Sequence, residues 1–367
     1  MLTWFSPCIW GNVDGYIGLR NFYHGSAVGR AITNAFWSIL GNDVFTLNKY
    51  DAHPETKKLK PWSHAMFVAS SFSILNYPTD IFDLVRNGTV NVHIADVTGL
   101  SSRTVHLSDG TQLDTDALCC VTGWKHVPPV KFLPEGIDKE LGLPHTPLES
   151  DLFTAEAVAT ADQEILSRFP RLQDQPIQNK NLKPLLATDG LTTTDAINPS
   201  TPLTPWTLYH FMVPPSARLL QTRDIAFAGV LLNFSTFLIA HAQAIWISAY
   251  FNDQLPASVL PPLTPRPSST ANPDEKKTKT IAEIRRETLL HARFGKWRYP
   301  AGHGAQFPDF VFDALPYVDL LVSDLGLKVH RKKGWLAEIS EPYGPEDYKD
   351  LVAEFAASVE ETQGRGV

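Results

Sequence analysis

The chain has 367 residues, of which 43% are hydrophobic and 19% charged, and its net charge at pH 7 is −7. This acidic balance excludes the basic face that a nucleic-acid-binding surface needs. Three cysteines are too few for a disulfide framework, and their spacing does not make a zinc site. No signal peptide is evident in Met1–Trp10, so a cytoplasmic protein is expected.

The first part of the chain is predicted to form helices and one strand. Apolar spacing favours a helix at Ser26–Leu40, with Gly41 as its C-cap. A short helix at Thr79–Asn87 is predicted to end at Gly88. The alternation that follows predicts a strand at Val90–Ala95.

A second strand is predicted at Val105–Leu107, followed by a tight turn at Ser108–Gly110. With Val90–Ala95 it would form an antiparallel ribbon. Ala117–Val121 is a continuous apolar run, which suits a strand buried on both faces. The run stops at Thr122-Gly123-Trp124, where a glycine lets the backbone approach a flat ligand.

The same order of elements recurs later in the chain. A helix is predicted at Ser150–Arg168 and a short aromatic-rich strand at Trp206–Val213. Asp224–Ala228 then predicts a strand that Gly229 breaks, and a helix follows at Ser235–Phe251. A strand, a glycine and a helix N-terminus together form a site for a polar or anionic ligand edge.

The remaining predictions concern a stretch without charged residues, a linker and a helical tail. The stretch between Asp224 and Asp253 lacks Asp, Glu, Lys and Arg, so a membrane span stays open as an alternative to a buried strand and helix. Residues 256–279 are rich in proline and predict a linker. Helices are expected from Thr280, at Phe310–Leu325 with a break at Pro316, and at Glu346–Glu361.

These motifs resemble the later part of the flavin-containing monooxygenases, in particular the fungal FAD-dependent monooxygenases of secondary metabolism. The resemblance rests on the Asp109-Gly110-Thr111 turn followed by Thr122-Gly123-Trp124, on Arg223–Gly229, and on the stretch from Arg298 to Leu327. It implies an α/β fold: part of a flavoprotein sheet with two dinucleotide-binding domains, a β-ribbon and an appended C-terminal helical cap.

The resemblance also implies a division of the chain into four parts. Residues 1–78 would be a remnant of the NADPH-binding domain with a helical insert, and residues 79–255 the later part of the FAD-binding domain. Residues 256–279 would be the proline-rich linker and residues 280–367 the helical cap. FAD and NADPH are the cofactors implied, and an apolar small molecule the substrate.

Five residues are implied to contact the cofactor: Thr122, Gly123, Trp124, Gly229 and Asn233. Gly123 and Gly229 would lie at neighbouring strand ends beside the flavin; the alternative is that both glycines only make tight turns. No catalytic residue is assigned, because FAD carries the redox chemistry in this family. No metal site is expected, since no two histidines lie one helical turn apart.

Two glycine-rich dinucleotide fingerprints are typical of the family, and neither occurs in this sequence. Three hypotheses follow. The chain is part of an FAD-dependent monooxygenase that oxidises an apolar metabolite with NADPH, with a polyketide as one implied substrate. Alternatively, it is a cofactor-free remnant that binds a metabolite or a partner protein, or it is anchored in a membrane by residues 225–251. The oligomeric state is not predicted.

Overall fold

The computed structural model describes residues 2–69, 77–121, 128–176, 203–263 and 278–364. These residues form helices and one small antiparallel sheet. The α-helices are α1 (Ile17–Gly25), α2 (Ala27–Leu47), α3 (Pro54–Lys57), α4 (Ile81–Arg86), α5 (Asp138–Leu141), α6 (Ala155–Arg168), α7 (Ala217–Thr222), α8 (Thr236–Phe251), α9 (Ile281–Arg298), α10 (Ala314–Asp324), α11 (Trp335–Ser340) and α12 (Leu351–Gly364). The strands are β1 (Val97–Ser101), β2 (Thr104–Leu107) and β3 (Gln112–Asp114). Short 3₁₀ helices lie at Leu2–Phe5, Gly11–Asp14, Tyr50–Ala52, Ala65–Phe67, Pro170–Gln173 and Pro345–Tyr348.

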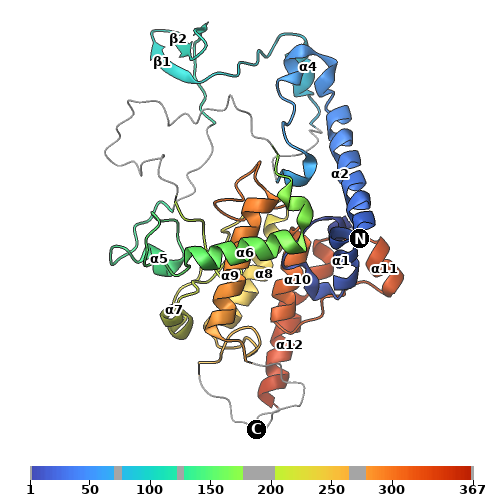
Figure 1. The fold of residues 1–367 in the computed structure, drawn as a ribbon, viewed down its shortest axis with the longest axis vertical. Coiled ribbons are helices and arrows are strands. Elements are labelled where there is room, and N and C mark those ends of the chain that lie inside the picture. The colour runs from blue at the N-terminus through green and yellow to red at the C-terminus, as the bar shows by residue number, and fades with distance from the viewer. Residues whose placement is uncertain (1, 70–76, 122–127, 177–202, 264–277, 365–367) are drawn as a thin grey trace.

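A helical body contains most of the molecule, and the small sheet lies apart from it (Figure 1). In the body, α6 packs against α9 and α8 packs against α10. Helix α2 runs from the body to the region of α4, and β1 and β2 lie beyond it (Figure 1). The fold therefore combines helices with a small sheet, and most of its buried side chains belong to one hydrophobic cluster in the body.

The N-terminal segment is fastened to the C-terminal helices inside this cluster. The Ser6 hydroxyl donates to Asp313 Oδ1 at 3.0 Å, and Trp10 Nε1 donates to the Asp313 carbonyl at 3.2 Å. Arg298 Nη2 donates to Ser6 Oγ at 3.0 Å, and the guanidinium lies 5.1 Å from the centre of the Trp37 ring. Residues about 300 positions apart thus share one buried network, and the four-part domain division stays a prediction.

Most of the predicted helices occur, with capping residues that explain where they begin. The Ser26 hydroxyl accepts from Gly29 N at the start of α2, and Asp80 caps α4 in the same way. Thr280 and Glu283 form a capping box at the start of α9. Helix α8 begins at Thr236, as expected, although the side chain of Ser235 makes no capping bond.

Several helix boundaries differ from the sequence-based expectation: α6 begins at Ala155 and not at Ser150, and α12 begins at Leu351 and not at Glu346. Helix α2 continues through Gly41 to Leu47, because Gly41 is a contact residue and not a cap: a Cβ built there would lie 3.3 Å from the Ala65 Cβ. Helix α10 starts at Ala314, so Pro316 lies in its first turn, where proline interrupts no hydrogen bond.

The antiparallel ribbon is confirmed, but its first strand is displaced. Residues 90–95 are not a strand; β1 starts at Val97, which pairs with Leu107. Val90 N donates to the Leu84 carbonyl at 2.9 Å. The Val90 N–H therefore bonds the end of α4 instead of pairing with a strand. The turn at Ser108–Gly110 is present, with Gly110 at φ +88°, and it leads into β3, a strand that was not predicted from the sequence.

The three other predicted strands are wrong. Residues 117–121 form no strand and are exposed, because no strand of the described residues lies beside them to bury an apolar run. Trp206–Val213 forms a turn in which Tyr209 and Val213 bridge each other. Asp224–Ala228 makes one backbone contact to this turn, from Phe227 N to the Met212 carbonyl, and forms no ladder.

None of the described helices is both long enough and apolar enough to cross a lipid bilayer. Residues 225–235 precede α8 and are not helical, so 225–251 is not one continuous helix.

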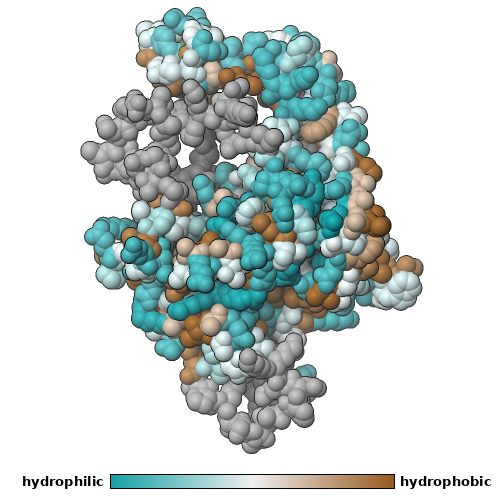
Figure 2. Space-filling view, in the orientation of Figure 1, coloured by the Kyte–Doolittle hydropathy of each residue, from teal (hydrophilic) through white to brown (hydrophobic). Residues whose placement is uncertain are grey.

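Helix α2 keeps an apolar stripe exposed to solvent. Val28, Ile32, Ile39 and Leu47 are between 42% and 64% exposed, and their spacing places the first three on one face of the helix. Hydrophobic side chains accordingly gather along the right-hand edge of the molecule, where α2 runs (Figure 2).

We expect Gly29→Ala to destabilise the fold strongly. Helices α1 and α2 cross so closely that a Cβ at Gly29 would lie 2.6 Å from the Cα of Tyr23. Since backbone atoms cannot move away cheaply, the loss should be on the order of 2 kcal/mol or more in urea unfolding. Gly18→Ala in α1 is the matched control, because nothing lies within 4 Å of its added Cβ. Equal stabilities for the two variants would contradict this packing.

We expect Asp319→Asn to stabilise the protein above pH 7 and to have little effect near pH 4. Asp319 accepts a hydrogen bond from the Tyr348 hydroxyl at 2.9 Å, and burial raises its pKa to about 7. A raised carboxyl pKa gives stability that is fully present below the unfolded pKa and lost as pH rises through 7. Asparagine removes that loss, worth at most about 4 kcal/mol. Urea titrations of both proteins at pH 4 and pH 8 measure the difference, and a pH-independent difference would contradict it.

Candidate functional site

The turn Tyr209–Val213 places a histidine inside the helical body. His210 and Phe211 have φ values of +49° and +61°, a region that non-glycine residues adopt only under constraint. The constraint includes a hydrogen bond of 2.7 Å from the Tyr317 hydroxyl to the His210 carbonyl. The imidazole of His210 is consequently held in the interior, where it is 1% exposed.

Two carboxylates flank this imidazole. His210 Nε2 lies 2.8 Å from Glu287 Oε1 on α9, and Nδ1 lies 2.8 Å from Asp324 Oδ2 at the end of α10. Trp246 Nε1 on α8 donates to the same Asp324 oxygen at 2.9 Å. Three helices and one turn therefore meet at a single imidazole.

The charges at this point compensate each other. Burial alone would lower the pKa of His210, but the charges of Asp324 and Glu287 and the hydrogen bond with Glu287 raise it to about 9. Burial alone would likewise raise the pKa of Glu287, but its hydrogen bond with His210 and the charges around it bring it well below its usual range. Lys279 also pairs with Glu287 and donates to the Tyr209 hydroxyl at 3.0 Å.

A second histidine lies beside this group. His291 follows Glu287 by one turn of α9, and its ring stacks on His210 with centroids 5.7 Å apart. Burial lowers the pKa of His291 to about 3, so the ring is neutral. Its Nδ1 is buried and has no hydrogen-bond partner among the described residues. We call His210, Glu287 and His291 the histidine cluster; one ligand atom of each lies within 4.8 Å of the others.

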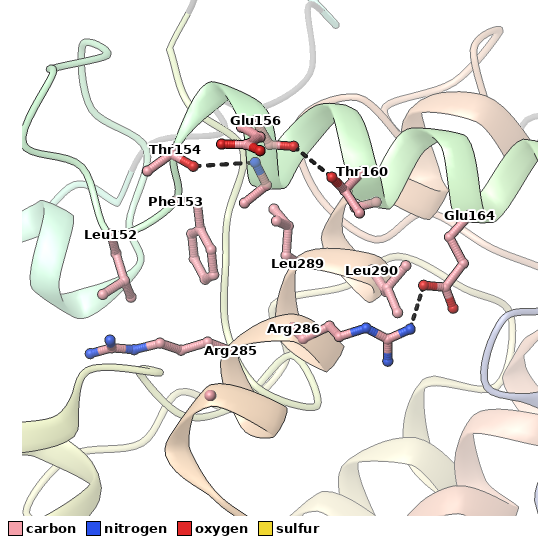
Figure 3. A pocket seen from close by; sticks show the side chains of 13 residues that line it. Leu152, Phe153, Thr154, Glu156, Thr160, Glu164, Arg285, Arg286, Leu289 and Leu290 are labelled. Atoms are coloured by element: carbon pink, nitrogen blue, oxygen red, sulfur yellow. Dashed lines mark hydrogen bonds and ion pairs between the residues drawn. The ribbon is translucent and has the colours of Figure 1, made fainter.

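Two hollows lie on either side of an ion pair between α6 and α9. The larger, of about 590 Å³, is lined by Glu287, His291 and Lys279, and we call it the cluster cavity. The other is a groove of about 410 Å³ between α6 and α9 (Figure 3). The Arg286–Glu164 ion pair lines both hollows.

The groove between α6 and α9 is apolar in its depth and charged at its edge (Figure 3). Phe153, Leu289 and Leu290 face its interior, and the side chains of Arg285 and Arg286 extend along its α9 side (Figure 3). Such a lining suits an apolar molecule of small size that carries a polar group.

Two of the five sequence-predicted contact residues are described, and they lie just before α8. Gly229 has a φ of +76°, and its N–H donates to Gln243 Oε1 at 3.0 Å. Gln243 Nε2 donates to the Tyr317 hydroxyl at 2.9 Å, which links Gly229 to His210 through two side chains. The side-chain oxygen of Asn233 accepts from Ser235 N, whereas its Nδ2 is buried and has no partner among the described residues.

The other three predicted residues, Thr122, Gly123 and Trp124, lie outside the described residues. Whether Gly123 and Gly229 lie side by side is therefore still a prediction. Neither hollow described above includes Gly229 or Asn233.

Sequence reasoning missed the histidine cluster. Glu287 and His291 have the i, i+4 spacing that places two side chains on one face of a helix, and this was the available signal. The search for paired histidines overlooked it, because the second histidine comes from a turn 77 residues before Glu287.

Comparison with known proteins identifies the class. The chain is 30% identical to FAD-dependent monooxygenase resA of Aspergillus sclerotiorum, over 84% of this chain and 48% of that protein. It is 30% identical to an FAD-dependent monooxygenase of Pyrenophora dematioidea, over 83% of this chain and 49% of that protein. An FAD-dependent monooxygenase of Alternaria brassicicola is 27% identical over 99% of this chain and 56% of its own length.

Over most of its own length the chain therefore belongs to the fungal FAD-dependent monooxygenases, which confirms the resemblance. It spans about half the length of the curated relatives it matches. No family model matches the chain. No solved structure matches it either.

We expect Tyr317→Phe to cost about 1–3 kcal/mol of unfolding free energy. The hydroxyl accepts from Gln243 and donates to the His210 carbonyl, so its removal leaves two buried polar groups unsatisfied. Tyr77→Phe is the matched control, because Tyr77 is 74% exposed. Chemical denaturation of the three proteins measures the loss, and similar midpoints would show that the link is dispensable.

Proposed function

We propose that this chain is part of an FAD-dependent monooxygenase that uses NADPH to insert one oxygen atom into an apolar small molecule. The observation that carries the proposal is its 30% identity over 84% of the chain to a fungal FAD-dependent monooxygenase. Bound FAD supplies the oxygen-activating redox chemistry, so the protein needs to bind, orient and exclude water.

The segment before α8 fits one edge of such a cofactor. The Nδ2 group of Asn233 is a buried donor without a partner among the described residues, and an amide donor suits a ring carbonyl or ring nitrogen. Gly229 is exposed and nothing lies within 4 Å of its added Cβ, so a flat ring can approach the backbone there. We therefore assign Asn233 and Gly229 to the flavin edge, with Thr122, Gly123 and Trp124 as further contacts.

The pyrophosphate of FAD needs a different kind of site. A glycine-rich turn between a strand and a helix would bind it, and the described residues form no such turn. We accordingly propose the finer fold, a partial dinucleotide-binding sheet, for a longer protein of which this chain would be one part.

The groove between α6 and α9 supports a substrate that is mainly apolar. Phe153, Leu289 and Leu290 supply apolar contacts, and Arg285 offers a cation at the edge for a carbonyl, enol or carboxylate oxygen. A metabolite-binding protein without cofactor is the second candidate, because this groove is formed entirely by α6, α9 and the segment before α6.

The first experiment is the visible absorption spectrum of the purified chain after incubation with FAD and removal of free flavin. We expect some flavin to be retained, bound weakly because the described residues form no pyrophosphate site, and a further loss of affinity by roughly 2- to 10-fold in Asn233→Ala, the worth of one hydrogen bond. Ser235→Ala is the control, since that hydroxyl makes no capping bond.

The outcomes separate the two candidates. Flavin retention with NADPH oxidation supports the monooxygenase. A folded chain that retains no flavin but binds an apolar probe in the groove supports the metabolite-binding protein. Equal flavin affinity in Asn233→Ala and the unaltered chain would overturn the assignment of Asn233.

A further inference from the structure

We propose that the histidine cluster is a binding site for one divalent transition-metal ion, with His210 Nε2, Glu287 and His291 as its ligands. Two imidazoles and one carboxylate are ligands typical of Zn²⁺ and of related ions. The proposal is independent of flavin binding, because no residue of the cluster belongs to the segment assigned to FAD.

The distances within the cluster fit an ion of this size. In a tetrahedral site with ligand bonds of about 2.1 Å, neighbouring ligand atoms lie roughly 3.4 Å apart. His210 Nε2 and Glu287 Oε1 are 2.8 Å apart, and all three ligand atoms lie within 4.8 Å of one another. The observed separations bracket the required value, so small side-chain rotations suffice.

The surroundings of His210 are those of a metal-binding histidine. Such a histidine donates its other ring N–H to a carboxylate, which fixes the ring and its tautomer. Asp324 Oδ2 lies 2.8 Å from His210 Nδ1, an ion-pair distance without the alignment of a hydrogen bond, and Trp246 fixes this carboxylate by a hydrogen bond of 2.9 Å. Nε2 is thereby the nitrogen that faces Glu287, and a bound ion would replace the proton that joins these two groups in the ion-free structure.

His291 supplies the second, independent observation. The side chain is 6% exposed, and its Nδ1 has no hydrogen-bond partner among the described residues. A buried ring nitrogen without a hydrogen-bond partner costs free energy unless another group or an ion satisfies it. An ion shared with Glu287, one helical turn away, explains why a histidine stands here.

The site has an entry path and an open side. Glu287 and His291 both line the cluster cavity of about 590 Å³, so an ion held by them faces that space. Three protein ligands leave a fourth position for water or a ligand oxygen from the cavity. Lys279 also lines the cavity and pairs with Glu287, and it therefore competes with the ion for that carboxylate.

The test is isothermal titration of the purified, tag-free chain with ZnCl₂, followed by the visible absorption spectrum of the Co²⁺-loaded protein. We expect one ion per chain and a Co²⁺ spectrum typical of four-coordination. His291→Leu should weaken Zn²⁺ binding more than 100-fold and leave the ion-free protein folded, because His291 Nδ1 has no hydrogen-bond partner among the described residues. Lys279→Met should tighten binding, since it removes the competing cation.

Two further variants keep the test decisive. His241→Leu removes a histidine of α8 that is not part of the cluster, and it should leave binding unchanged. Asp324→Asn keeps the three ligands and should weaken binding about 10- to 100-fold, the usual effect of losing the partner of a ligating histidine. No binding by the folded chain, or binding that His291→Leu leaves intact, would overturn the proposal.

Discussion

The buried imidazole of His210 between Glu287 and Asp324 is the contact on which the helical body depends. It joins the Tyr209–Val213 turn to α9 and α10, and through Trp246 it includes α8. A buried ion pair repays its desolvation only when each partner is fully bonded, and removal of one partner typically costs about 3–5 kcal/mol. The relative position of these helices is consequently fixed at one point, and the strained backbone of His210 is tolerated there.

This fixed position gives α9 two different faces. Glu287 and His291 are turned toward the cluster cavity, whereas Arg285 and Leu289 line the groove against α6. Both hollows are bounded by the Arg286–Glu164 ion pair. A ligand that extends from one hollow into the other has to remove water from this ion pair, which costs free energy. The arrangement therefore favours short ligands, or ligands with a polar group at that point.

The sequence predicted local features well and the site poorly. The helices from Ser26 and Thr280, and the turn at Gly110, depend on neighbouring residues and were predicted. The apolar runs at Ala117–Val121 and Asp224–Ala228 predicted strands that do not form, because a strand needs partners that composition alone cannot supply. The histidine cluster unites a turn with a helix 77 residues later, and only the folded chain reveals it.

A close backbone contact connects the proposed flavin edge with α9. Gly295 on α9 and Gly304 approach so closely that a Cβ on either would collide with the carbonyl oxygen of the other. The loop that carries Gly304 continues to Pro308 and Phe310, whose backbone groups bond Leu232 at 2.8 and 3.0 Å. Leu232 directly precedes Asn233, so backbone contacts connect the proposed flavin-edge segment to α9. Closely packed backbone atoms have little room to move independently of each other. A side chain at Gly295 or Gly304 should therefore displace both Asn233 and the histidine cluster.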